Sequence, residues 1–141
     1  RFDIHAETDR VLYMDDYAHH PREIEASLSS VREMWPEKKL TVAFQPHLYS
    51  RTNDFYPDFA KSLSLADLVI LLDIYPAREL PGVTSALIAD RLSVPCVRVT
   101  KEDFPAYVRE HVTDGLFVTM GAGDIDRFIP VFTDMFNTAN H

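Results

Sequence analysis

The sequence has only one cysteine, Cys96, among its 141 residues. No internal disulfide can form, which favours a reducing compartment. Long hydrophobic runs are missing too, since the longest, at residues 68–72, is far shorter than the roughly 20 residues of a membrane-spanning helix. No secretory signal is visible either. We therefore expect a cytoplasmic protein that neither spans nor binds a membrane.

Glycine and positive charge are also scarce. None of the four glycines stands before a lysine, so the Gly-Lys-Thr or Gly-Lys-Ser of a P-loop is absent, as is a Gly-x-Ser-x-Gly nucleophile motif. Against 22 aspartates and glutamates stand 14 lysines and arginines, a net charge of −8. Binding to nucleic acid phosphates needs a basic surplus, so the charge argues against nucleic acid as the main partner.

What the sequence does contain is typical of a globular domain, with 46% apolar and 26% charged residues. Short apolar segments alternate with amphipathic ones. Expected strands cover residues 2–7, 11–15, 40–45, 68–73, 96–99 and 116–120, and expected helices cover 21–35, 55–63, 84–92, 101–112 and 125–136. This alternation predicts an α/β fold, a three-layer Rossmann-like domain with a mostly parallel sheet and helices on both faces. A short polar turn at residues 8–10 adds an antiparallel strand near the N-terminus.

The domain organisation follows from the same pattern. No repeat, low-complexity segment or internal linker interrupts it, so residues 1–141 are expected to form one domain. The chain begins at Arg1, and its first methionine, Met14, falls inside an expected strand. We therefore expect the chain to be a piece of a longer protein.

Prolines mark the expected helix boundaries. Pro21 suits the first position of the helix at 21–35, and Pro36 stops that helix. Residues 46–52 are expected to form a polar loop before the next helix, which places Pro57 in the first turn of that helix.

A first polar segment follows the second expected strand, at the edge of a parallel sheet where ligands bind. It reads Asp15-Asp16-Tyr17-Ala18-His19-His20-Pro21 and holds two acids and two imidazoles. An aspartate there can cap the next helix or bind a cation or a ribose hydroxyl, and a histidine can cap, contact phosphate or bind metal. Capping and ligand binding both stay open for each residue. The density of titratable groups in the segment as a whole points to function.

Two further segments follow later strands. The first, Gln45-Pro46-His47-Leu48-Tyr49-Ser50-Arg51, lets His47 and Arg51 face one pocket, where an arginine suits bidentate capture of a carboxylate or phosphate. The alternative is a surface loop in which Ser50 or Thr52 caps a helix. The second segment, Gly-Ala-Gly-Asp at 121–124, either admits a ligand or makes a tight strand-to-helix turn.

Metal binding is not expected. Residues of zinc-ligand type occur close together at Asp16, His19, His20 and His47. Adjacent side chains point apart, however, and the sequence has no His-x-x-x-His pair. We therefore predict that the chain has no metal site.

A non-enzymatic alternative fits part of the sequence. The acidic pair Asp15-Asp16, the strand-terminal Asp73 and the pair Thr100-Lys101 resemble the phosphorylation site of a two-component receiver domain. A receiver has no role for the histidines or for the glycine segment, and glutamate follows the lysine where receivers carry proline.

Four segments together resemble the C-terminal domain of the bacterial Mur ligases. They are residues 15–21, residues 44–52 with the run Gln-Pro-His-x-Tyr-x-Arg, residues 73–79 and residues 120–125. The resemblance covers essentially the whole chain and is strongest to the members that join L-alanine to UDP-N-acetylmuramate. Murein-peptide ligases, which share the His-His-Pro motif without that run, are the second candidate. Leu48 is a departure, since many members carry a second arginine there.

The resemblance implies a three-domain cytoplasmic ligase of peptidoglycan precursor synthesis. The other domains hold UDP-N-acetylmuramate, ATP and Mg²⁺, and this domain brings L-alanine, so the chain alone is expected to be inactive. ATP activates the muramate carboxylate as an acyl phosphate, which the alanine amine attacks. Asp16 and His19 match positions on the nucleotide side. Tyr17, His47 and Arg51 match the amino-acid side, with Arg51 on the carboxylate and His47 orienting or deprotonating the amine.

Overall fold

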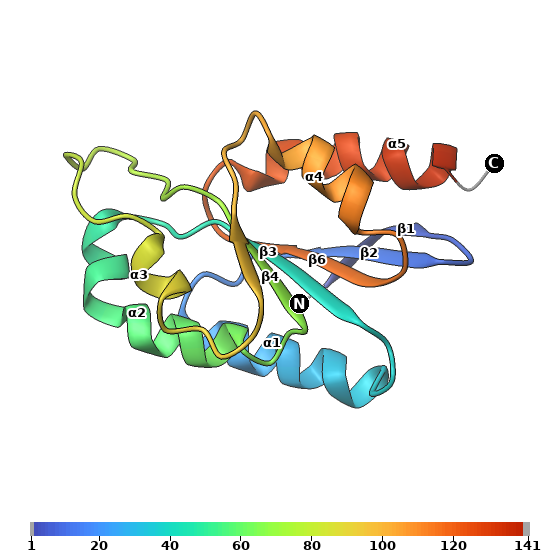
Figure 1. Cartoon of the computed structure of the whole chain (residues 1–141), viewed down its shortest axis with the longest axis horizontal. Coiled ribbons are helices and arrows are strands. Elements are labelled where there is room, and N and C mark those ends of the chain that lie inside the picture. Colours follow the sequence, from blue (N-terminus) through green and yellow to red (C-terminus); the bar gives the residue numbers. More distant parts are fainter. Residues whose placement is uncertain (1, 140–141) are drawn as a thin grey trace.

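Figure 1 shows a twisted sheet with helices on either side of it. The computed structural model describes residues 2–139, and its strands form one sheet in the order β1-β2-β6-β3-β4-β5. The strands are β1 (Asp3–Glu7), β2 (Val11–Asp16), β3 (Leu40–Phe44), β4 (Leu68–Leu71), β5 (Cys96–Arg98) and β6 (Gly115–Met120). β1 is antiparallel to β2, and the other neighbouring strands are parallel. The predicted α/β fold with an antiparallel strand at the N-terminus is confirmed.

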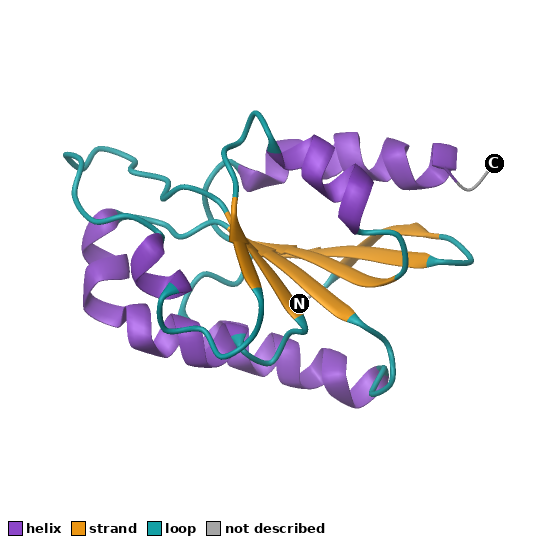
Figure 2. Ribbon diagram, viewed as in Figure 1, coloured by secondary structure: helices purple, strands orange, loops and turns teal. Residues whose placement is uncertain are grey.

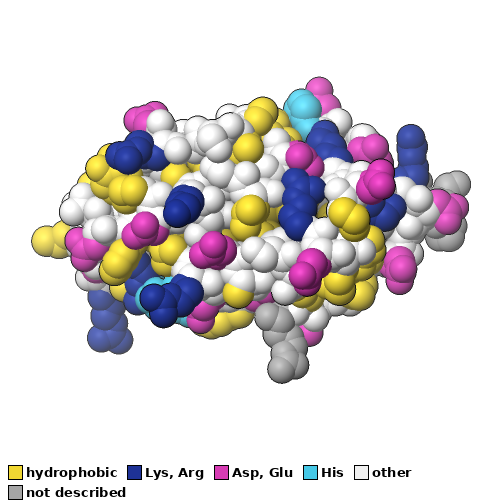
Figure 3. Space-filling model, turned by 90° about the horizontal axis from the view of Figure 1, so that it is seen from below, with side chains coloured by type: hydrophobic (Ala, Val, Ile, Leu, Met, Phe, Trp, Pro, Cys, Tyr) yellow, Lys and Arg dark blue, Asp and Glu magenta, His cyan; other side chains and the backbone are white. Residues whose placement is uncertain are grey.

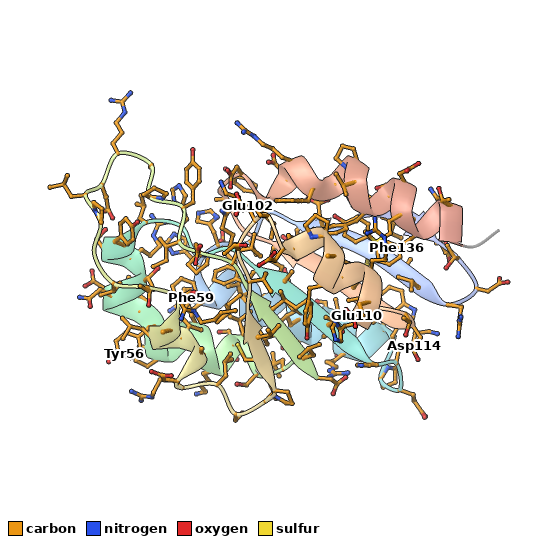
Figure 4. All side chains as sticks on the ribbon, turned by 45° about the horizontal axis from the view of Figure 1, so that its top comes forward. Tyr56, Phe59, Glu102, Glu110, Asp114 and Phe136 are labelled. Atoms are coloured by element: carbon orange, nitrogen blue, oxygen red, sulfur yellow. The ribbon has the colours of Figure 1, made fainter. Side chains whose placement is uncertain are left out.

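Helices cover both faces of the sheet (Figure 2). They are α1 (Pro21–Met34), α2 (Tyr49–Leu63), α3 (Ala86–Ala89), α4 (Phe104–His111), the 3₁₀ helix η1 (Ile125–Phe128) and α5 (Ile129–Ala139). α1, α2 and α3 lie on one face, and α4 and α5 lie on the other. Phe59 of α2 and Phe136 of α5 accordingly belong to separate buried clusters (Figure 4). The predicted three-layer arrangement is confirmed.

Helix α1 forms where the sequence predicts it. Pro21 occupies the first turn, and the Glu23 carboxylate accepts the backbone N–H groups of His19 and His20, both at 3.1 Å. These bonds, the one from His19 first, lower the pKa of Glu23. Ile24 and Leu28 are fully buried against the sheet. Local capping and an apolar stripe therefore suffice to define this helix.

Helix α2 begins at Tyr49, inside the segment that the sequence predicts as a loop. Its first turn is capped from a distance, because Glu79 accepts hydrogen bonds from the Ser50 N–H (3.0 Å) and from the Ser50 hydroxyl. Pro57 consequently lies inside the helix, and its prediction in the first turn is wrong. The capping carboxylate stands 29 residues away in the sequence, so local patterning could not reveal it.

Other helix boundaries differ from the predicted ones as well. Of the helix expected at 84–92, only Ala86–Ala89 is α-helical, and the helix expected at 101–112 begins at Phe104. The last helix, expected from residue 125, starts as the 3₁₀ turn η1 before α5 continues it. These short or tightened first turns shift boundaries without changing which faces the helices cover.

The surface over α1 and α2 carries both signs of charge. In Figure 3, acidic and basic side chains alternate with apolar ones across this face. Across residues 2–139, no helix has the length and apolar character that spanning a membrane demands.

Substitution of Gly115 is expected to destabilise the fold. This glycine opens β6 with φ +84°, and a Cβ atom built there would lie 2.4 Å from the Lys39 carbonyl oxygen. We expect Gly115→Ala to lower the free energy of unfolding by roughly 1–3 kcal/mol, because an L side chain is strained at this φ and collides with backbone. Urea unfolding measures the loss. Gly82→Ala is the control, since Gly82 meets only the Tyr49 side chain, at 3.3 Å; equal losses in both variants would contradict the argument.

Candidate functional site

The carboxyl ends of the parallel strands bring His47 between two other rings. Residues after β3 and β4 form a backbone bridge, with Leu48 N–H donating to the Tyr75 carbonyl and Tyr75 N–H donating to the Pro46 carbonyl, both at 2.8 Å. The His47 and Tyr75 rings stack with centroids 5.6 Å apart. On the other side, the His19 ring lies 6.4 Å from His47. The structure therefore brings the first two polar segments close together at this edge.

Arg51 lies in the first turn of α2, four residues after His47, and contacts its ring. Arg51 Nη1 lies 3.4 Å from His47 Nδ1, a long hydrogen bond in which the guanidinium is the donor. Nδ1 is then the acceptor, so the neutral imidazole carries its proton on Nε2. Burial first, and then Arg51 and His19, lower the pKa of His47. His47 is thus a neutral ring that offers Nε2–H as a donor at pH 7.

Among residues 2–139, the Arg51 guanidinium forms no salt bridge with a carboxylate. Glu79 lies near enough for Arg51 to lower the pKa of its carboxyl, after the stronger effect of the Ser50 hydrogen bonds. Arg51 can therefore take up a carboxylate or phosphate without first breaking an ion pair.

The neighbouring His19 ring has the opposite tautomer. Its Nδ1 lies 3.1 Å from the Tyr17 carbonyl oxygen, which can only accept, so Nδ1 carries the proton and Nε2 is the acceptor in the neutral ring. His19 and His47 together offer one acceptor and one donor. The Tyr17 ring is 66% exposed and meets His19 edge-on at 5.5 Å, so it reaches His47 only through His19.

Asp16 is buried, and its carboxylate is engaged by the segment that follows it. Oδ1 accepts the Ala18 N–H at 2.9 Å and Oδ2 accepts the Ser27 hydroxyl at 2.6 Å. Asp16 also lines an open hollow of about 400 Å³ beside α1, together with Tyr17. Asp16 therefore shapes the loop between β2 and α1 and borders a space that a ligand can enter.

The glycine segment after β6 packs against Gln45. The Gln45 side chain is 2% exposed, and its amide bonds Asp124 and the backbone of Ile125. Asp124 in turn receives the Lys101 ammonium at 2.7 Å. These contacts join the ends of β3 and β6 at the carboxyl edge of the sheet.

Comparison with known proteins decides the family. The sequence profile described as "Mur ligase, glutamate ligase domain" matches residues 1–123. The chain belongs to the Mur ligase family. The resemblance carried by the four polar segments is thus confirmed.

Two members of the Mur ligase family illustrate the similarity. The chain is 50% identical over 141 residues to the UDP-N-acetylmuramate--L-alanine ligase of Phocaeicola vulgatus, covering 97% of this chain and 31% of that protein. The chain thus spans about a third of the length of this relative. The MurC structure from Thermotoga maritima, a UDP-N-acetylmuramate-alanine ligase, is 29% identical with a TM-score of 0.78 and matches 99% of this chain and 30% of its own.

A more distant member shows the shared fold. The MurF ligase of Thermotoga maritima, solved in complex with ADP, is 19% identical over 99% of this chain and 31% of its own, with a TM-score of 0.64. At this identity the likeness concerns the fold alone, and the nucleotide is a property of that protein.

The receiver interpretation does not survive these findings. In a receiver the lysine would have to approach the phosphorylated Asp73, whereas Lys101 is paired with Asp124.

Within residues 2–139 no three His, Cys, Asp or Glu side chains are arranged to hold a metal ion. The expected absence of a metal site stays a prediction.

Sequence reasoning singled out His19, His47 and Arg51, which this Mur ligase domain brings together. It missed Tyr75, the stacking partner of His47, and the polar contacts of the Gln45 side chain. Both residues stood inside the segments that carry the family resemblance, which was the available signal. Their roles depend on contacts across the sheet that strand and helix periodicity does not encode.

Proposed function

We propose that this chain is the C-terminal domain of an ATP-dependent ligase that joins L-alanine to UDP-N-acetylmuramate in the cytoplasm. The observation that carries the proposal is 50% identity to a protein of that name across 97% of the chain. Because the chain spans 31% of that relative, the sugar nucleotide and the ATP phosphates are assigned to parts outside it. Residues 1–141 act as one domain in this proposal.

The reaction needs a carboxylate activated by ATP. Transfer of the γ-phosphoryl group to the muramate carboxylate gives an acyl phosphate and ADP. The neutral amine of alanine attacks the acyl carbon, and the tetrahedral intermediate expels inorganic phosphate to leave the amide. The amine must lose a proton before it can attack.

In this proposal Arg51 and His47 hold the amino acid. The guanidinium of Arg51, which has no salt bridge among residues 2–139, forms two parallel hydrogen bonds with the alanine carboxylate. His47, neutral with its proton on Nε2, orients the substrate by donating a hydrogen bond. This tautomer favours orientation over deprotonation by His47. Tyr17 covers the amino-acid side from its exposed position next to His19.

Asp16 and His19 are proposed to face the nucleotide. Asp16 borders the hollow beside α1, and His19 exposes Nε2 as an acceptor for a ribose hydroxyl. The chain fits this edge contact but supplies no phosphate cradle, because its glycines form no P-loop. ATP and Mg²⁺ are therefore assigned mainly to another domain, where Mg²⁺ would neutralise phosphate charge.

The decisive experiment compares amino-acid substrates in the full-length protein. With ATP, Mg²⁺ and UDP-N-acetylmuramate, we expect phosphate release that depends on L-alanine, and mass spectrometry should detect the alanyl product. Residues 1–141 alone should fold, as judged by circular dichroism, yet release no phosphate above background. Activity with a tripeptide but not with L-alanine would instead identify a murein-peptide ligase. L-Alanine-dependent activity of the isolated chain would refute the assignment of the ATP site to another domain.

A further inference from the structure

The Gln45 side chain joins the end of β3 to the loop after β6. Its Nε2 donates to Asp124 Oδ1 at 2.7 Å, and its Oε1 accepts the Ile125 N–H at 2.9 Å. The backbone N–H fixes the orientation of the amide, because only the oxygen can accept from it. Both ends of the amide are therefore satisfied in a side chain that is 2% exposed.

Asp124 receives a second contact from a third loop. Its Oδ2 accepts the Lys101 ammonium at 2.7 Å. Glu102, the residue after Lys101, is labelled in Figure 4 and shows that the segment before α4 reaches this edge of the sheet. Burial raises the pKa of Asp124, but the bonds from Lys101 and Gln45 outweigh it and hold the pKa below its usual value. Asp124 is therefore an ionised acceptor at neutral pH.

The glycines of the 121–124 segment make room for Gln45. A Cβ atom on Gly123 would lie 2.4 Å from Gln45 Oε1 and 2.7 Å from Tyr75 Cβ. Gly121, at φ +138°, would place a Cβ atom 2.7 Å from the Gln45 carbonyl oxygen. The sequence left a ligand approach or a tight turn open here, and in the structure these glycines admit the side chain and backbone of the neighbouring loop.

The same contacts fix His47. Gln45 precedes Pro46-His47, whose backbone is tied on the other side to Tyr75. We propose that Gln45, Asp124 and Lys101 form a polar lock that positions His47 and Arg51 for the amino acid. The inference rests on the proposed function. Gln45 and Asp124 are positioning residues in it, because they act through the loop that carries His47.

Removing the amide tests the lock first. Gln45→Met keeps the length of the side chain but leaves Asp124 and the Ile125 N–H without their partner. In the full-length ligase we expect kcat/KM for L-alanine to fall about tenfold through looser positioning, with the KM for UDP-N-acetylmuramate nearly unchanged. Unchanged alanine kinetics in this folded variant would overturn the proposal.

A charged residue at position 45 should change the pH dependence of the reaction, which a general loss of stability would not do. Gln45→Glu places a carboxylate against Asp124, where the amide nitrogen now lies 2.7 Å from Oδ1. The two carboxylates repel, so the pKa of the introduced group rises, while Lys101 keeps Asp124 ionised. A raised pKa means that the contact persists with a proton at low pH and is lost as the pH rises. The kcat/KM for L-alanine should therefore decline with pH more steeply than in the parent enzyme.

The pair Gln45→Glu/Asp124→Asn should reverse this effect. The introduced amide donates to the introduced carboxylate and still accepts from Lys101, and the carboxylate accepts the Ile125 N–H. All three hydrogen bonds return, and only the bond between positions 45 and 124 has its donor and acceptor exchanged. We expect alanine kinetics within about threefold of the parent and a parental pH profile, the coupling that contacting residues show in a double-mutant cycle. A pair no better than Gln45→Glu alone would refute the lock.

Ser64→Ala is the matched control. Ser64 Oγ also makes two hydrogen bonds, to the Ala60 carbonyl at 2.7 Å and from the Ser93 N–H at 3.1 Å, but at the far end of α2. Its loss should lower the melting temperature without changing the alanine KM or the pH profile. If the parent ligase does not use L-alanine, the proposed function fails, while the pH effect and its reversal still test the lock with the substrate that the enzyme does use.

Discussion

Replacing Arg51 with alanine in the full-length ligase is expected to lower kcat/KM for L-alanine by at least about a hundredfold. The methyl group of alanine contributes only about 0.8 kcal/mol on burial, so recognition depends on its two charged groups. Hydrogen bonds to a charged partner contribute roughly 1.5–3 kcal/mol, and lost positioning adds to that. Arg51 has no competing salt bridge among residues 2–139, and Leu48 supplies no second cation beside it.

Neighbouring substitutions sharpen this prediction. Arg51→Lys should recover only part of the activity, because an ammonium cannot form the planar fork of a guanidinium. Leu48→Arg should be tolerated, since Leu48 is only half-buried, and should tighten alanine binding by adding a cation.

Steady-state titration of L-alanine at saturating ATP and UDP-N-acetylmuramate measures each Arg51 and Leu48 variant. The KM for ATP is the internal control and should change little. An alanine KM and kcat for Arg51→Ala within about twofold of the parent would mean that another group holds the carboxylate.

Substitution of Asp16 or His19 is expected to act on ATP instead. Asp16→Ala and His19→Ala should each raise the KM for ATP or lower kcat by about ten- to a hundredfold, the effect of losing a hydrogen bond to a charged or polar ligand group. Asp16 also accepts the Ala18 N–H and the Ser27 hydroxyl, so its removal loosens the loop that carries His19.

Two further variants separate binding from loop support. Asp16→Asn retains an oxygen for the Ala18 N–H and serves as the shape-matched variant, while Ser27→Ala removes one support of Asp16 without removing the carboxylate. ATP titrations and melting temperatures are measured together on all four variants. Unchanged ATP kinetics with lower melting temperatures would reduce Asp16 and His19 to structural residues of the β2–α1 connection.

The layers of this protein follow from local sequence patterns. The continuous apolar run at residues 68–72 is typical of a strand in a sheet that is covered on both faces. α1 follows from local signals, namely Pro21 in its first turn, Glu23 on the preceding N–H groups and Pro36 after its end. Polar segments placed directly after strands predict that the candidate site lies at the carboxyl edge, since parallel strands end on one side.

The assembly of that edge depends on contacts between distant segments. Glu79 starts α2 earlier than the local pattern predicts, and Tyr75 stacks on His47 from the next strand. Gln45 reaches Asp124, 79 residues away, through a space that exists because Gly123 has no side chain. Helical and strand periodicity reports which face of one element is apolar. Contacts between loops at the ends of different strands arise only when the sheet brings those loops together, so they are absent from any local pattern.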